Sequence, residues 1–212
     1  MPRRLTPRWV GTSGLLFVSL VIIAIAIGTA PEADATDAEI LEYYTDSGNQ
    51  TKQMVAAIIL TAAVIALLVF VSGLRRALLD VSVPAVFADV AFLGGSAAAL
   101  VVLAGWAVGT AVPATFVFSD TFELDPDTAR VILTAGNIWL VSFAGAVGSL
   151  LVGSVSLASR RIDLLPTWLE WAGLVLAPLM LIALPLFGLA AIVLAVWVLA
   201  VSLTLLIRSK AS

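Results

Sequence analysis

Long apolar runs constrain the fold of this chain more than any other feature. A hydrocarbon layer of about 30 Å takes roughly 20 helical residues to cross, and several runs reach that length. Apolar residues make up 61% of the 212 residues and charged residues 12%, against about half and one quarter in a typical soluble domain. The longest polar stretch, 31–52, is too short for a sizeable water-soluble domain. We therefore expect an all-α, polytopic membrane bundle.

The apolar runs divide into six expected transmembrane helices, arranged as three hairpins. They cover residues 9–28, 54–73, 85–112, 131–158, 168–184 and 188–207, with long loops at 29–53 and 113–130. The last two helices share one apolar stretch, in which Leu184–Gly188 supplies the turn. Pro178 is expected to kink the fifth helix because proline lacks a backbone donor. The chain, 1–212, is predicted to be a single membrane domain.

Basic residues occur in four clusters, which six crossings place on one side of the membrane. The clusters are Arg3, Arg4 and Arg8; Arg75 and Arg76; Arg160 and Arg161; and Arg208 and Lys210. The two long loops instead carry ten acidic and two basic residues. The positive-inside rule then predicts a multi-pass protein of a prokaryotic plasma membrane with both termini cytoplasmic. The acidic outer face does not favour nucleic acid as a partner.

The first apolar run has two interpretations. Its basic flank and the small residues 28–30 match a cleavable signal peptide. Its full 20 residues match a membrane helix, which is the interpretation that we favour.

Cysteine and histidine are both absent from the chain. Their absence excludes disulfides, thiol nucleophiles, His-ligated haem and His-based acid–base catalysis. We therefore predict no metal site, no cofactor and no enzymatic activity. A lipid-modifying enzyme that uses the acids of the loops is a minor alternative.

Three sequence patterns mark helix starts. Thr36–Glu39 and Thr167–Glu170 both match a capping box, in which a threonine and a glutamate bond to each other's backbone N–H. Asp125–Asp127 combines an N-cap acid, a first-position proline and a second acid near the positive end of the helix dipole. These patterns predict a short helix to about Asp46, the start of the fifth membrane helix, and the start of the fourth.

Asp89 is the principal ionisable candidate within the membrane, because charged groups in hydrocarbon are costly and are often functional. One interpretation is a cation or proton site that is reached from the cytoplasm. The other is an interfacial acid stabilised by the helix N-terminus and by nearby Arg75 or Arg76.

Asn137 is the one carboxamide within a predicted membrane helix. It either bonds to a neighbouring helix as part of the packing or lines a small polar cavity. Trp106 and Trp139 are predicted to lie at a comparable depth and to wall such a cavity.

The two outer loops offer further candidate surfaces. In the first, Glu39, Glu42 and Asp46 share one helical face, which either attracts cations or is simply solvated. In the second, Phe116, Phe118 and Phe122 indicate a lid packed on the bundle or a contact for a partner.

Small residues recur at four-residue spacing on two predicted helices. They are Gly105 and Gly109 on the third, and Gly145, Ser149 and Gly153 on the fourth. Such spacing lets helix backbones approach closely within a bilayer. It predicts contact between these two helices, or self-association or contact with a membrane-protein partner.

The layout resembles a group of small bacterial six-helix integral-membrane proteins with no assigned activity. The segments that carry the resemblance are Ala35–Ile40, Ser72–Arg76 and Leu165–Leu169, together with the basic start. The resemblance implies a bacterial multi-pass membrane protein and supplies no catalytic residues.

From the sequence we expect a membrane protein without a catalytic site, acting as a scaffold, sensor or accessory subunit within the lipid bilayer. The alternative is a small transporter or channel with a polar path near Asn137 and Asp89.

Overall fold

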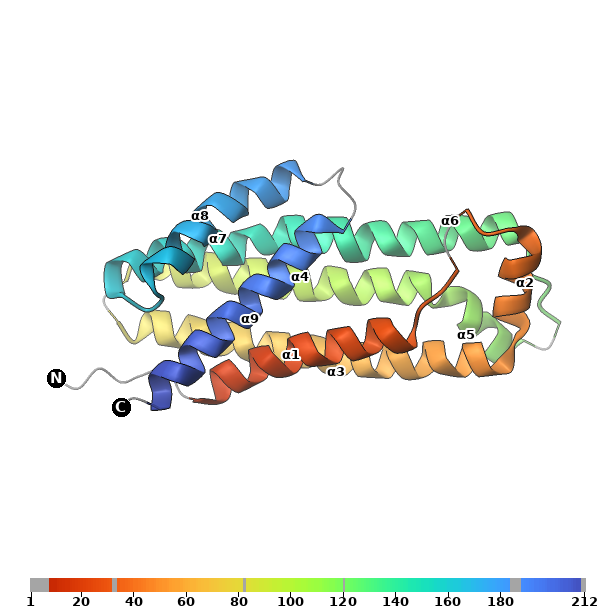
Figure 1. The fold of residues 1–212 in the computed structure, drawn as a ribbon, viewed down its shortest axis with the longest axis horizontal. Coiled ribbons are helices and arrows are strands. Elements are labelled where there is room, and N and C mark those ends of the chain that lie inside the picture. The colour runs from red at the N-terminus through yellow and green to blue at the C-terminus, as the bar shows by residue number, and fades with distance from the viewer. Residues whose placement is uncertain (1–7, 32–33, 82, 120, 184–187, 211–212) are drawn as a thin grey trace.

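The computed structural model is a bundle of α-helices, and its described residues contain no β-strand (Figure 1). It describes residues 8–31, 34–81, 83–119, 121–183 and 188–210. The helices are α1 (Arg8–Ile27), α2 (Asp37–Thr45), α3 (Ser47–Leu79), α4 (Ala85–Gly109), α5 (Ala111–Phe118), α6 (Pro126–Asn137), the π-helix η1 (Ile138–Phe143), α7 (Ala144–Ile162), α8 (Thr167–Ile182) and α9 (Leu189–Lys210).

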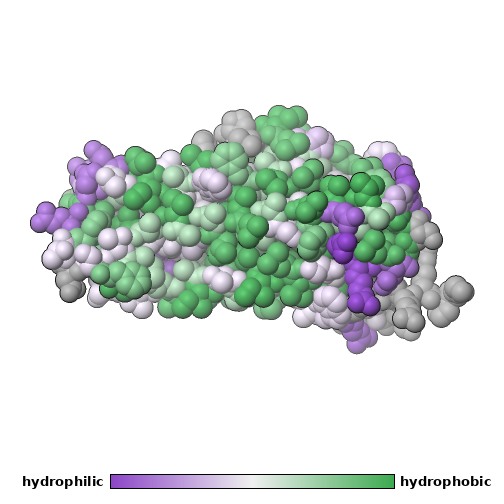
Figure 2. Space-filling model, turned by 180° about the vertical axis from the view of Figure 1, so that it is seen from behind, coloured by the Kyte–Doolittle hydropathy of each residue, from purple (hydrophilic) through white to green (hydrophobic). Residues whose placement is uncertain are grey.

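Among the described residues, five helices are long and apolar enough to cross a membrane. They are α1, α3, α4, the continuous helix Pro126–Ile162, and α9. The apolar helix α8 is shorter, at 16 residues. Figure 2 shows apolar residues in a broad belt over the middle of the molecule and hydrophilic residues mostly towards its ends. The prediction of an all-helical bundle with several membrane-compatible helices is confirmed.

Several helices differ in length from the predicted membrane spans: two continue past their apolar runs, and one ends earlier. Helix α3 begins at Ser47 rather than at residue 54, since the Asp46 carboxylate caps it by accepting from the Asn49 N–H at 2.7 Å. The fourth apolar run, predicted at 131–158, is part of a helix spanning Pro126–Ile162. The third, predicted to end at residue 112, ends at Gly109, and α5 follows. The predicted loops 29–53 and 113–130 therefore contain helices.

Helix α1 starts and α9 ends at the same end of the bundle (Figure 1). There the Arg8 guanidinium donates to the backbone oxygen of Ser209 at 3.3 Å. We call this the basic end, after its arginines Arg8, Arg75, Arg76, Arg160, Arg161 and Arg208. Helix α1 packs along α3, α4 packs along α7, α8 packs mainly on α7, and α9 crosses both α7 and α1.

The opposite end carries a cap, which we define as α2, α5 and the segments 34–36 and 121–125. At 1.5 Å per residue, the 33 residues of α3 span about 50 Å and the 37 residues of Pro126–Ile162 about 55 Å. Both exceed a hydrocarbon layer of about 30 Å. The excess length supports the cap, which has its own small buried cluster of Ile40, Tyr44, Val112 and Ala129.

Arg130 of α6 joins the α2 side of the cap to the bundle. Its guanidinium donates to Asp37 at 2.6 Å, to Asp127 at 2.8 Å and to the backbone oxygen of Ala35 at 2.8 Å. These contacts tie the start of α2 to α6, although 93 residues separate Asp37 from Arg130.

The phenylalanines of the second loop are divided between packing and exposure. Phe116 and Phe122 meet edge to face with ring centroids 5.0 Å apart, which agrees with a packed lid. Phe118 is 87% exposed.

Two of the three predicted helix starts are confirmed. Thr36 and Glu39 form both bonds of a capping box at α2, and Asp125 caps α6 by accepting from the Thr128 N–H at 3.0 Å. The box predicted at Thr167 is wrong. Pro166 is the residue before α8, and no side chain caps that helix.

Glu170 is buried, at 6% exposure, and turns towards α7. It accepts a hydrogen bond from the Ser159 hydroxyl at 2.7 Å, and the same hydroxyl accepts from the Leu165 N–H at 2.7 Å. Pro166 takes the N-cap position, and its carbonyl accepts from the N–H groups of Leu169 and Glu170. Thr167 is thus already inside the helix and cannot act as its cap.

The predicted contact between the third and fourth apolar segments exists and involves Gly105 and Gly109, but their partner is Gly136, which was not among the predicted residues. A Cβ built on Gly105 would lie 2.9 Å from the carbonyl oxygen of Gly136, which places Gly105 on α6. Gly145 faces Ala190 of α9 instead, and Gly153 faces Ala177 of α8. Helix α7 carries small residues on more than one face, so their spacing does not select the neighbour.

Most of the predicted turn at 184–188 lies outside the described residues. Gly188 is described and has a φ of +90°, which suits glycine. Pro178 lies inside α8, as expected.

Candidate functional site: a pocket beneath the cap

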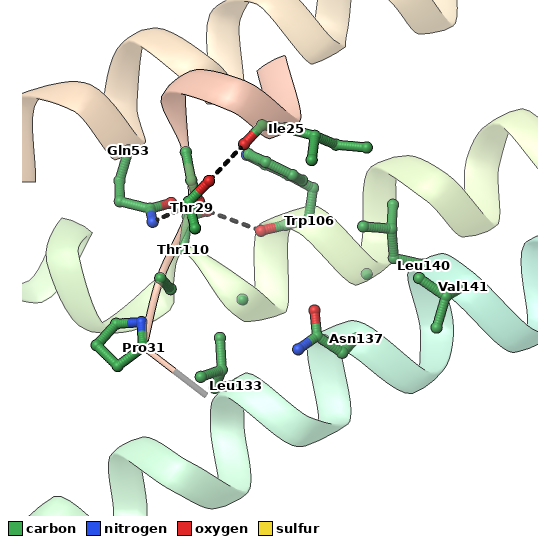
Figure 3. Close-up of a pocket in the computed structure, with 15 residues that line it drawn as sticks. Ile25, Thr29, Pro31, Gln53, Trp106, Thr110, Leu133, Asn137, Leu140 and Val141 are labelled. Carbon is green, nitrogen blue, oxygen red and sulfur yellow. Dashed lines mark hydrogen bonds between the residues drawn. The ribbon is translucent and has the colours of Figure 1, made fainter. Parts of the chain in front are cut away.

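A pocket of about 270 Å³ lies just beneath the cap, where α1, α3, α4 and the α6–η1 segment meet (Figure 3). Its walls come from segments far apart in the sequence, and most of them are apolar. The lining residues are Ile25, Gly28, Thr29, Ala30, Pro31, Gln53, Gly105, Trp106, Gly109, Thr110, Leu133, Gly136, Asn137, Leu140 and Val141.

The α4 wall meets the α6–η1 wall at a crossing of glycines. A Cβ on Gly136 would lie 2.7 Å from the backbone nitrogen of Gly109 and 2.8 Å from the carbonyl oxygen of Gly105. A Cβ on Gly105 would lie 2.7 Å from the backbone nitrogen of Leu140. Only glycine permits backbones to approach this closely. The crossing therefore fixes the distance between the two walls.

A π-helical segment, η1, follows Asn137 directly. Its wider turn is shown by the Ala144 N–H, which donates to the carbonyl oxygen of Trp139, five residues back. Short π-helices within α-helices are rare and occur often at functional sites. The buried hydroxyl of Ser142 on this segment has no hydrogen-bond partner among the described residues. No sequence pattern indicated this feature.

Gln53 holds the α1 side of the pocket in place. Its side chain is buried, and its amide nitrogen donates to the carbonyl oxygen of Gly28 and to the hydroxyl of Tyr43, both at 2.9 Å. Tyr43 in turn donates to the carbonyl oxygen of Thr29 at 2.7 Å. This network links α1, α2 and α3. Sequence analysis missed Gln53, which stands one residue before the predicted start of the second helix.

Asn137 and Trp106 are brought together, as the sequence predicted, and both line the pocket. The Asn137 carboxamide extends into the space between α6 and α4 (Figure 3) and makes no side-chain hydrogen bond with the described residues. The indole nitrogen of Trp106 is buried without a hydrogen-bond partner in that part of the chain. The hydroxyls of Thr29 and Thr110 donate to the carbonyl oxygens of Ile25 and Trp106.

None of the described residues that line the pocket is ionisable. The pocket therefore offers hydrogen-bonding groups in an apolar setting and no charge. Such a lining suits the binding of an uncharged molecule better than acid–base chemistry, which requires a titratable group near the reacting atoms.

The other two membrane candidates lie elsewhere. Trp139 is absent from the pocket lining and 44% exposed, with its ring edge on Phe143. Asp89 lies near the basic end, and its carboxylate accepts from the guanidinium of Arg75 at 2.8 and 3.0 Å. Arg75 also lies over the ring of Phe92. The Asp89 side chain is half-exposed, which agrees with the interpretation of an interfacial acid.

Two of the three acids on the predicted acidic face act as helix caps. Glu39 accepts from the Thr36 N–H at 2.8 Å, and this bond and the one from the Thr36 hydroxyl lower the pKa of Glu39 below its ordinary value. Asp46 caps α3, and Glu42 is exposed. Within the described ranges, no group of three or more His, Cys, Asp or Glu residues is placed to hold a metal ion.

Comparison with known proteins adds no relative: no protein family, curated protein or solved structure matches this chain.

Proposed function

We propose that this chain is a six-crossing protein of a prokaryotic plasma membrane that binds a small uncharged molecule in the pocket beneath its cap, as a sensor or accessory subunit. The pocket carries the proposal, because it combines an apolar wall with the Asn137 carboxamide, which makes no side-chain hydrogen bond with the described residues. Pockets of this composition are typical of small-molecule sites.

The orientation follows from charge. The arginines at the basic end favour the cytoplasm under the positive-inside rule, so that both termini are cytoplasmic and the cap is external. For the sixth crossing we rely on α8, which is apolar and starts at the basic end. Its 16 residues span about 24 Å, and flanking residues complete a crossing.

A binding role is favoured over catalysis and over transport. Within the part of the chain that the structure describes, no titratable side chain lines the pocket for acid–base work. A transport path would have to run along α4 from Asn137 to Asp89. Between them, α4 packs tightly, since a Cβ on Gly94 would lie 2.5 Å from the Leu150 side chain and one on Gly95 would lie 2.6 Å from that of Val71.

Labelling of single introduced cysteines tests this proposal, and the native chain contributes no background because it has no cysteine. A membrane-impermeant maleimide is applied to intact cells and to inverted vesicles. The variants are Asn137→Cys at the pocket, Ala98→Cys in the packed middle of α4, Asp89→Cys at the basic end, and Ala38→Cys on the cap as a control.

We expect positions 137 and 38 to label from outside and position 89 from inside. Position 89 labels from inside under either function, because its side chain is half-exposed. Position 98 decides between them. If it is protected from both sides, the pocket is closed below and binding is supported; if it is labelled, a path crosses the bundle and the transport alternative replaces our proposal. Protection of position 137 would contradict an externally open pocket.

A further inference from the structure

The pocket lies at the depth of the outer membrane interface. Helix α1 has 20 residues and spans about 30 Å, close to the thickness of the hydrocarbon layer. Because α1 starts at the basic end, its last residues reach the opposite boundary. Ile25, Gly28 and Thr29 at this boundary line the pocket. The pocket therefore spans the boundary between acyl chains and headgroups.

The pocket also opens sideways, towards lipid. Helix α1 packs on α3 and α9, and α6 packs on α4, but α1 and α6 do not pack on each other. Ile25 lines the pocket and is 53% exposed, so the opening reaches the molecular surface beside α1. Exposed apolar residues are also present on both of these elements, with Ile22 on α1 and Phe143 on η1. A molecule dissolved in the outer leaflet meets this opening directly.

The polar groups of the pocket favour a ligand whose polar end is uncharged. The exposed Asn137 carboxamide, which makes no side-chain hydrogen bond with the described residues, offers a donor and an acceptor. A charged head would lose its hydration here without gaining a counter-charge, which is costly. The arginine of α6, Arg130, is already engaged with Asp37 and Asp127.

The volume limits the size of the occupant. At about 270 Å³ the pocket is slightly smaller than a typical drug-binding site. It accommodates a small head and the first part of one chain, and a whole phospholipid exceeds it.

We infer that the ligand is a neutral single-chain amphiphile of the outer leaflet. Its uncharged head bonds to Asn137, and its chain lies along Ile25, Leu140 and Val141. The inference rests on the proposed function and specifies the ligand class of the same pocket.

Photo-crosslinking tests this class in vesicles that contain the full chain. The neutral probe is a monoacylglycerol with a diazirine in its acyl chain. The fatty acid with the same chain and a phosphatidylglycerol with the same chain are the anionic comparisons. Mass spectrometry then locates the crosslinks. We expect the monoacylglycerol to label residues 25–31 and 133–141 more strongly than either anionic probe.

Three variants show whether the crosslinks come from a probe that is bound in the pocket. Gly109→Leu should fill it, because Gly109 lines the pocket and a Cβ there meets no atom within 4 Å. Ala107→Leu adds a similar side chain to an exposed position of the same helix and serves as the matched control. Asn137→Leu removes the polar group with little change of shape, and the loss of one neutral hydrogen bond should lower the monoacylglycerol yield about fivefold.

The inference stands if the monoacylglycerol yield falls with Gly109→Leu and Asn137→Leu and is unchanged with Ala107→Leu. Equal yields for neutral and anionic probes would overturn it and indicate adventitious lipid only. A yield that is unaffected by Gly109→Leu, or no crosslink at either segment, would overturn it as well. In each of these cases, external labelling of position 137 still tests independently whether the pocket is open. Failure of the inferred ligand class can therefore be distinguished from failure of the proposed function.

Discussion

At the scale of single residues, the most consequential side chain outside the pocket is Glu170. It is buried between α7 and α8, and through Ser159 it is connected to the backbone of Leu165. Acids within a membrane protein are costly unless they are paired. The pattern Thr167–Glu170 nevertheless predicted an ordinary capping box. A four-residue pattern cannot reveal that Pro166 takes the N-cap position in place of Thr167 and that the Glu170 carboxylate bonds to a neighbouring helix.

The first prediction concerns substitutions of Glu170. Glu170→Gln keeps an oxygen that accepts from Ser159 and should change the free energy of unfolding by less than about 1 kcal/mol. Glu170→Ala leaves the Ser159 hydroxyl without its acceptor and opens a cavity, and should destabilise the fold by about 1–3 kcal/mol. Thermal unfolding in detergent, followed by circular dichroism, measures both. Equal losses for the two variants would show that the hydrogen bond is unimportant.

The second prediction concerns Tyr44, whose burial in the cap raises its pKa from 10.0 to about 12. The neutral phenol is favoured in the folded state, so its contribution to stability is fully present below pH 10. That contribution is lost as the pH rises through about 12. Tyrosinate absorbance should show one tyrosine that titrates late in the folded protein. Tyr44→Phe should remove this late titration and reduce the alkaline loss of stability; if both persist, burial of Tyr44 is not their cause.

Some of the residues that line the pocket could be predicted from their residue types. Asn137 and Trp106 were identified because polar and indole groups within apolar runs are unusual. Trp139 was misplaced because side chains two positions apart on a helix point in nearly opposite directions, so that Trp139 cannot share the pocket-facing side of Asn137. Gln53 was overlooked because it lies at the border of a polar segment, where a buried amide is not expected.

At the scale of helices, the glycine crossing between α4 and α6 sets the geometry of the pocket. The glycines of the two helices differ in the space around them. Gly136 faces backbone atoms at 2.7–2.8 Å, whereas Gly109 faces open space. The sequence analysis selected Gly109 and omitted Gly136, because it considered only glycines repeated at four-residue spacing on one helix.

The third prediction uses this inequality. Gly136→Ala forces the two backbones apart and should destabilise the bundle by about 1–3 kcal/mol. Gly109→Ala meets no neighbouring atom and should be neutral or stabilising by up to about 1 kcal/mol, since alanine favours helix over glycine. Thermal unfolding of both variants under the same conditions gives the comparison. A similar effect of the two substitutions would mean that the crossing is looser than described.

Helix lengths could be predicted only in part. Hydropathy locates the apolar centre of a helix and does not register polar turns beyond the hydrocarbon. The Asp46 cap starts α3 seven residues before Met54, and Asp125 starts α6 five residues before Val131. These polar extensions build the support for the cap, and so the existence of the cap could not be foreseen from apolar runs.

At the scale of the whole molecule, the structure separates two ends. Arginines gather at one end, where α1 begins and α9 ends, and acids gather on the cap at the other. The alternation of apolar runs and basic clusters predicted this polarity well, because charge and hydropathy are properties of the sequence itself. The position of the pocket depends on which helices do not pack on each other. That arrangement arises only when the bundle is assembled, and so it could not be read from the sequence.

The measurement that tests the central claim most directly is the sidedness of the two ends. Single cysteines are placed at Ala38 on the cap, at Asp80 after α3, and after Ser212. An impermeant maleimide then labels intact cells or inverted vesicles. Six crossings with an external cap predict that position 38 labels only in cells and the other two only in inverted vesicles. Labelling of the C-terminal cysteine and of position 38 both from outside would establish an odd number of crossings, and internal labelling of position 38 would place the pocket in the cytoplasmic leaflet.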